Sequence, residues 1–210
     1  MRPIALVVTL ILLLIPAPGF ADQFEVRLYG VPVGNLHVSQ TLKNGRYSAS
    51  AQFRTKGLVG ALRKVAFEMK ARGDMKNGAF RALHYSEDMN TGERESRETV
   101  AFKKGGARMD PLTALLVGLE PRTFDTGCKV NQVVFDGKRT HRFTLSTKMK
   151  SPQRLICKGQ FVRLKGYSPA QLRQLKAYDF TAQYEREGES YVFISGRART
   201  LHGPVTIVRQ

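Results

Sequence analysis

The residues that could do chemistry in this sequence are few, and the two cysteines come first among them. Cys128 and Cys157 are the only cysteines in the 210 residues. Two thiols are too few for a structural zinc site, which takes four protein ligands, and they lack the Cys-x-x-Cys spacing of a redox pair. In a chain with an export signal, described below, an even pair favours a disulfide. We therefore predict a Cys128–Cys157 disulfide.

The four histidines do not show the spacing of a metal site. They lie in separate segments, at His37, His84, His141 and His202. A single histidine on a strand is usually structural or solvated. The sequence also lacks the His-Glu-x-x-His motif, the P-loop, the Gly-x-Gly-x-x-Gly fingerprint and the calcium-binding loop. We therefore expect no metal and no cofactor.

One short segment is similar to the nucleophile elbow of serine hydrolases. It reads Gly-Tyr-Ser-Pro-Ala at 166–170 and places Ser168 at the nucleophile position. That motif requires a parallel α/β sheet, whereas the strands predicted here are antiparallel, and its last glycine is replaced by Ala170. The same residues predict the start of a helix, in which Ser168 is the N-cap, Pro169 takes the first position and Gln171 completes a capping box. The prediction is therefore a helix cap and no enzyme, with a hydrolase of unrecognised type as an alternative.

The element that must organise the chain is a short apolar helix. Residues 109–119 read Met-Asp-Pro-Leu-Thr-Ala-Leu-Leu-Val-Gly-Leu, with leucines at i, i+3, i+4 and i+7. Asp110 is the predicted N-cap, and Pro111 suits the first helical position. No charge falls between Asp110 and Glu120. A helix that is apolar nearly all round is buried, and this one is too short to cross a bilayer.

Most of the remaining sequence predicts short β-strands. Apolar and polar residues alternate in segments such as 23–33, which is typical of half-buried strands. Turn signals separate them at Gly34-Asn35, Asn44-Gly45 and Asp136-Gly137, and the last two are typical of type I′ hairpins. About ten to twelve short antiparallel strands result. The predicted fold is mainly β: a curved antiparallel sheet, β-barrel or β-spiral wrapped around the short helix.

The N-terminus has the pattern of a secretory signal peptide. Arg2 supplies the positive charge, residues 4–15 are apolar except for Thr9, and Gly19 and Ala21 occupy the cleavage-site positions. An uncleaved membrane anchor is the alternative, but the apolar run is short for that role. We predict a signal peptide at 1–21 and a single domain at 22–210, which is long enough to bury a core.

The chain carries a large positive charge. Its formal net charge is +17, and the lysines and arginines are spread along the predicted strands. In an exported protein this charge favours anionic lipid headgroups, lipopolysaccharide or wall polymers over nucleic acid. Solubility alone is the alternative explanation.

Several short blocks in a fixed order resemble an exported bacterial family of unknown function, DUF3108. They include Leu-Tyr-Gly-Val-Pro-Val-Gly at 28–34 and Asp-Pro-Leu-Thr-Ala-Leu at 110–115. The other blocks lie at 55–62, 84–87, 135–139, 157–159 and 166–169. The resemblance covers nearly the whole exported part. It implies a Gram-negative periplasmic protein with a curved antiparallel sheet, similar to lipid- or lipoprotein-handling folds and to envelope-integrity β-spirals. It carries over no catalytic residues.

Together these features predict a non-catalytic periplasmic protein whose concave interior binds an amphipathic ligand, such as a lipid or lipoprotein, or an envelope partner. The predicted lining residues are Leu58, Leu62, Leu112, Leu115 and Leu116. The predicted contacts to anionic headgroups are Arg54, Lys56, Arg63 and Lys64. We expect a monomer, attached to a membrane at most peripherally.

Two alternatives to this function remain open at the level of sequence. In the first, the helix fills the core and leaves no pocket. In the second, the chain is a small outer-membrane β-barrel. The second is disfavoured because the sequence has no tryptophan for an aromatic girdle and has charges in most strands.

Overall fold

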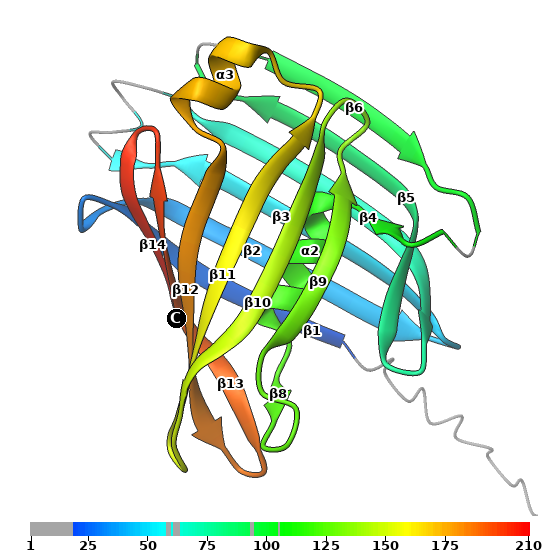
Figure 1. The fold of residues 1–210 in the computed structure, drawn as a ribbon, viewed down its shortest axis with the longest axis vertical. Helices are drawn as coiled ribbons and strands as arrows, with labels where there is room; N and C mark the ends of the chain where they lie inside the picture. The colour runs from blue at the N-terminus through cyan, green and yellow to red at the C-terminus, as the bar shows by residue number, and fades with distance from the viewer. Residues whose placement is uncertain (1–18, 58–59, 61–63, 93–94, 105) are drawn as a thin grey trace, which may run out of the picture.

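The computed structural model describes residues 19–57, 60, 64–92, 95–104 and 106–210. In these residues fourteen strands form one open, strongly curved sheet, and two helices are present (Figure 1). The predicted mainly β fold with a curved sheet is therefore confirmed. The number of strands exceeds the ten to twelve expected because two of them are only two residues long.

The N-terminal half of the sheet is an antiparallel meander. It consists of β1 (Gly19–Leu28), β2 (Val31–Lys43), β3 (Arg46–Thr55), β4 (Ala66–Lys76), β5 (Ala79–Asn90) and β6 (Glu95–Ala101). The predicted cleavage after Ala21 would remove the first three residues of β1. The pairing of β1 with β14 would survive, because it begins at Phe24.

The C-terminal half contains a second meander. Its strands are β9 (Lys129–Phe135), β10 (Thr140–Lys150), β11 (Arg154–Lys165), β12 (Ala177–Glu187), β13 (Ser190–Thr200) and β14 (Gly203–Arg209). Two short strands, β7 (Arg108–Met109) and β8 (Arg122–Thr123), lie outside the meander, and β7 pairs in parallel with β9. The sheet order is β6-β5-β4-β3-β2-β1-β14-β13-β12-β11-β10-β9-β7, and β8 pairs with β13. Strand β14 joins the two halves by pairing with β1.

The turns show where local sequence signals decide the structure. Asn44 and Gly45 both have positive φ, at 52° and 70°, as a type I′ hairpin requires. At Asp136-Gly137 the hairpin is present but the predicted turn type is wrong. Only Gly137 has positive φ, and the Asp136 carboxylate instead accepts hydrogen bonds from the N–H groups of Lys138 and Arg139.

The first predicted turn is misplaced. The chain reverses at Tyr29-Gly30, where φ is 51° and 81°, and Gly34-Asn35 lies inside β2. Position 34 requires a glycine for another reason, because a Cβ there would lie 2.3 Å from the carbonyl oxygen of Arg54 on β3. The glycine therefore permits the close approach of two strands, which local sequence does not reveal.

The apolar helix α2 (Pro111–Leu119) is enclosed by the sheet. Figure 1 shows it between the β9–β12 layer and the β1–β5 layer. Asp110 is its N-cap, and the Asp110 side chain accepts a hydrogen bond of 2.8 Å from the Thr113 N–H. Leu112 and Leu116 are fully buried, and the helix contacts β3, β4, β5 and β9.

The second helix, α3 (Pro169–Gln174), lies on the surface at one end of the sheet (Figure 1). Ser168 caps it, and both bonds of the predicted capping box are present. The Ser168 hydroxyl accepts a hydrogen bond of 3.2 Å from the backbone N–H of Gln171. In return, the side-chain amide oxygen of Gln171 accepts a hydrogen bond of 2.9 Å from the backbone N–H of Ser168. The strands on either side of α3, β11 and β12, are antiparallel, so the parallel setting of a nucleophile elbow is not found there.

The two cysteines lie at disulfide distance. The Cα atoms of Cys128 and Cys157 are 5.9 Å apart, and both residues are buried. Cys128 directly precedes β9, and Cys157 lies within β11. Thr147 on β10 pairs with Cys157, and its hydroxyl accepts a hydrogen bond of 3.0 Å from the Cys128 N–H. The pair therefore ties the segment that leaves α2 to the C-terminal half of the sheet.

Candidate functional site

An apolar cavity of about 400 Å³ lies between α2 and strands β10–β14. Its size falls within the roughly 300–1,000 Å³ typical of sites for small ligands. The helix contributes Pro111, Ala114, Leu115, Gly118 and Leu119 to the wall. Arg197 is the one charged residue among those that line it. The cavity is therefore a candidate site for an apolar group.

The cavity exists because α2 is apolar on more than one face. Leu112 and Leu116 bury one face in the core, while Leu115 and Leu119 turn another toward β10–β14. Gly118 sits on this second face, and a Cβ there would come no nearer than 4.0 Å to the Phe143 ring. Its missing side chain leaves room beside the helix.

Six aromatic rings form part of the opposite wall. They are Phe143, Phe161, Tyr178, Phe180, Tyr184 and Phe193. Phe143 and Phe180 are stacked, with ring centroids 6.0 Å apart and planes at 11°. Gly159 fixes the position of Phe180, since a Cβ on this neighbour in β11 would lie 2.1 Å from the ring. The wall is thus made of rings held in place by their neighbours.

The hydroxyl of Tyr184 is satisfied without adding polarity to the cavity. It donates a hydrogen bond of 2.6 Å to the carbonyl oxygen of Gly118, near the end of α2. Burial raises the pKa of Tyr184 above its ordinary value. The Arg122 guanidinium lies 5.9 Å from the centre of the same ring and donates to the carbonyl of Val117. These bonds hold the end of α2 against the wall.

Glu120, the C-cap residue of α2, has a carboxyl group with a raised pKa. Burial raises the pKa of its carboxyl to about 7, and the positive charge of Arg122 opposes that rise. Because the ordinary value is 4.5, the carboxyl retains its proton over a pH range in which an exposed glutamate is ionised.

A cluster of polar and aromatic side chains lies next to the cavity wall at Tyr178. The Arg163 guanidinium is placed between two rings, 4.7 Å from the centre of Tyr167 and 5.1 Å from that of Tyr178. It also donates to the carbonyls of Gln171 and Leu175, and so anchors α3 to β11. The ring of His141 bonds the Tyr167 hydroxyl, and burial lowers the pKa of His141 to about 4. This cluster holds α3 in place at that end of the sheet.

The structure separates the leucines that the sequence groups together. Leu115 lies in the cavity wall. Leu112 and Leu116 lie in the core beside it and do not line the cavity. Leu58 and Leu62 are outside the residues that the structure describes.

Three of the four cations predicted to meet headgroups are described, and they do not line the cavity. Arg54, Lys56 and Lys64 are exposed at the end of β3 and just before β4, and Arg63 is outside the described residues. The ends of these two strands are joined by a hydrogen bond of 2.9 Å from the Thr55 N–H to the carbonyl of Val65.

Sequence reasoning missed the aromatic wall. Its signal is the alternation of Tyr178, Phe180, Ala182 and Tyr184 along β12, which marks one face of the strand. Alternation shows that these side chains share a face. It does not show whether that face meets a tightly packed neighbour or a cavity.

Comparison with family models, with curated proteins and with solved structures found no match. Within the described ranges, no helix combines the length and apolar character needed to cross a membrane. No group of three or more His, Cys, Asp or Glu side chains in that part of the chain could hold a metal ion.

Proposed function

We propose that this protein is a non-catalytic carrier or sensor that binds the acyl part of an amphipathic ligand in the cavity beside α2. The observation that supports this most directly is the composition of the wall, in which aromatic and aliphatic side chains predominate. Each Å² of apolar ligand surface moved from water into such a wall contributes roughly 25 cal/mol. A polar ligand would lose its hydrogen bonds to water and would find few hydrogen-bonding groups in the wall to replace them.

The setting forms part of the same proposal. The N-terminal pattern supports export, and the ordered motifs support kinship with DUF3108 and a periplasmic location. The positive net charge supports a ligand whose head is anionic.

The test is binding of a fluorescent fatty acid, dansyl-undecanoic acid, to protein purified after export. The unmodified protein is expected to bind the probe with a blue shift in emission. Gly118→Leu places a side chain in the cavity and also improves helix propensity, so it should weaken binding at least tenfold without loss of stability. Ala198→Leu fills the cavity from the opposite wall and should act in the same direction.

The matched control is Ala170→Leu, which adds the same kind of side chain to the exposed helix α3. It should bind the probe as the unmodified protein does. The proposal is contradicted if the unmodified protein fails to bind, or if both cavity-filling variants bind with unchanged affinity while folded.

A further inference from the structure

Three large apolar side chains are exposed together on two adjacent hairpin turns. Tyr29 is 69% exposed, Val31 is 55% exposed and Leu201 is 44% exposed. Tyr29 and Val31 flank Gly30 at the β1–β2 turn, and Leu201 belongs to the β13–β14 turn. We call these three residues the apolar tip. Exposed apolar side chains that cluster, rather than lie singly, mark interaction surfaces.

The two turns are held together as one unit. Strands β1 and β14 are paired up to Leu28 and Val205, and the Tyr29 N–H donates a hydrogen bond of 3.0 Å to the carbonyl of Pro204. The Tyr29 ring lies against Gly203, where a Cβ would come within 2.3 Å of the ring. The absence of a side chain at Gly203 therefore leaves room for the Tyr29 ring. Contact with Gly203 holds the ring in one place, although most of the ring faces solvent.

The surroundings of the apolar tip are cationic. Residues 26–67 and 190–210, which include the tip and strands β2, β3, β13 and β14, contain no Asp or Glu, and the nearby Glu25 of β1 is paired with Arg27. Arg199 is exposed and pairs with Pro204, and Lys56 is exposed and bonded through its N–H to the carbonyl of Val33 on β2. Neither cation forms an ion pair within the described part of the chain.

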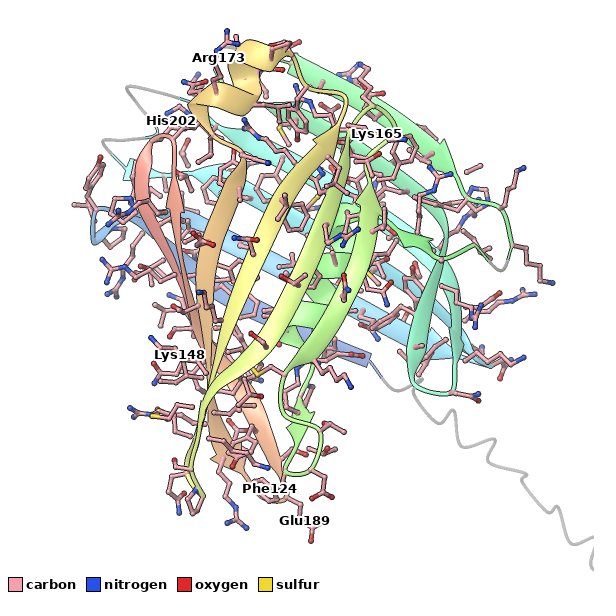
Figure 2. The ribbon with its side chains drawn as sticks, in the orientation of Figure 1. Phe124, Lys148, Lys165, Arg173, Glu189 and His202 are labelled. Carbon is pink, nitrogen blue, oxygen red and sulfur yellow. A yellow bond between two sulfur atoms is a disulfide. The ribbon has the colours of Figure 1, made fainter. Side chains whose placement is uncertain are left out.

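Further basic side chains lie toward the end of the molecule that carries the β13–β14 turn. Figure 2 shows His202 at the apolar tip and Arg173 and Lys165 at the same end. A surface that combines an exposed tyrosine, aliphatic side chains and unpaired cations matches the interfacial region of an anionic bilayer, where aromatic rings sit at headgroup level and cations meet phosphate.

We propose that the apolar tip docks this protein on the surface of a membrane that contains anionic phospholipid. The tip is continuous with the cavity described above. Val205 and Ala198 line that cavity and pair with each other, and the Thr200–Gly203 pair at the turn lies two positions farther along the same hairpin. Docking at the tip therefore brings the cavity wall close to the bilayer. The proposal extends the proposed function, but its test needs no ligand in the cavity.

The experiment is flotation of the exported protein with vesicles of phosphatidylethanolamine and phosphatidylglycerol, compared with vesicles of phosphatidylcholine alone. The unmodified protein should float with the anionic vesicles, and added salt should release it. The double variant Tyr29→Asn/Leu201→Ser should lose at least tenfold in vesicle affinity. Asparagine replaces Tyr29 because asparagine tolerates the positive φ at this position, so the variant is expected to fold.

A charge variant and a control complete the test. Arg199→Glu/Lys56→Glu should abolish the preference for anionic vesicles. Met149→Ser removes an apolar side chain with the same 44% exposure as Leu201, but on β10, and should float unchanged. Gly118→Leu should float with the anionic vesicles to the same extent as the unmodified protein. The tip variants should still bind the fatty-acid probe in solution. Flotation and probe binding therefore test the docking proposal and the cavity proposal independently.

The proposal is overturned if the unmodified protein does not float with anionic vesicles, if it floats equally with neutral ones, or if the tip variants float as it does. A dimer in sedimentation that disappears in the tip variants, without any vesicle binding, would also overturn it and would assign the tip to a second copy of the chain.

Discussion

Among the individual residues, Thr113 bonds two other buried polar side chains at once. Its hydroxyl lies 2.6 Å from an oxygen of Asp110 and 2.7 Å from the hydroxyl of Tyr47, and all three side chains are almost completely buried. Burial raises the pKa of Asp110 and that of Tyr47 above their ordinary values. Thr113 donates to the carboxylate and can accept from the phenol, so one hydroxyl satisfies two buried groups.

Thr113→Val keeps the shape of the side chain and removes both bonds. We expect it to destabilise the fold by about 1–3 kcal/mol, because the Tyr47 hydroxyl and one carboxylate oxygen are left buried without this partner. Urea unfolding measures the effect. Tyr47→Phe is the companion variant, and the double variant should be less destabilised than the sum of the two single ones. Strict additivity would show that the three groups do not act as a network.

Glu120 gives a prediction that depends on pH. Because burial raises the pKa of the folded state from 4.5 to about 7, the folded protein binds more protons than the unfolded chain between those values. This contribution to stability is present below about pH 4.5 and is lost as the pH rises toward 7. Glu120→Gln mimics the protonated carboxyl, so its stability relative to the unmodified protein should increase across that window.

Urea midpoints of both proteins below pH 4.5 and above pH 7 measure this difference. A difference that stays constant with pH would contradict the raised pKa of Glu120, whatever other groups titrate in both proteins.

Among the elements, the segment that leaves α2 and strand β11 are joined by the cysteine pair. Their sequence separation is 29 residues, and a bond closing a loop of that size stabilises by about 3–4 kcal/mol in the chain-entropy model. Cys128→Ser should therefore lower the melting temperature by roughly 5–10 °C. A thiol count on the denatured, unreduced protein tests the bond itself, since two free thiols per chain would rule it out.

Elements whose signals are local could be predicted from sequence. The cap of α2 depends on Asp110 and Thr113, and that of α3 on Ser168 and Gln171, so each is encoded within four consecutive residues. The misplaced first turn has the opposite cause. Gly34 is required by Arg54, a residue twenty positions away that becomes its neighbour only when β2 and β3 pair.

For the whole molecule, the mainly β class and the buried helix followed from periodicity, but the cavity did not. The spacing of four leucines shows that α2 is apolar, but it does not distinguish the face of Leu112 from the face of Leu115. That distinction arises because β3–β5 pack closely on one side of the helix, while the aromatic strands stand farther off on the other. Such spacing depends on sheet curvature, which single-sequence patterns do not record.

The central place of β14 determines when the sheet can be completed. Among the described strands, its ladder with β1 is the one backbone ladder between the two meanders, and it pairs residues 24–28 with residues 205–209. Chains are synthesised from the N-terminus. Until residues 203–209 have left the ribosome, the earlier strands can form two separate meanders but no continuous sheet. Final closure spans nearly the full chain, which is the slowest kind of contact to form. The continuous sheet can therefore form only after β14, the last of the described strands in chain order, has been synthesised.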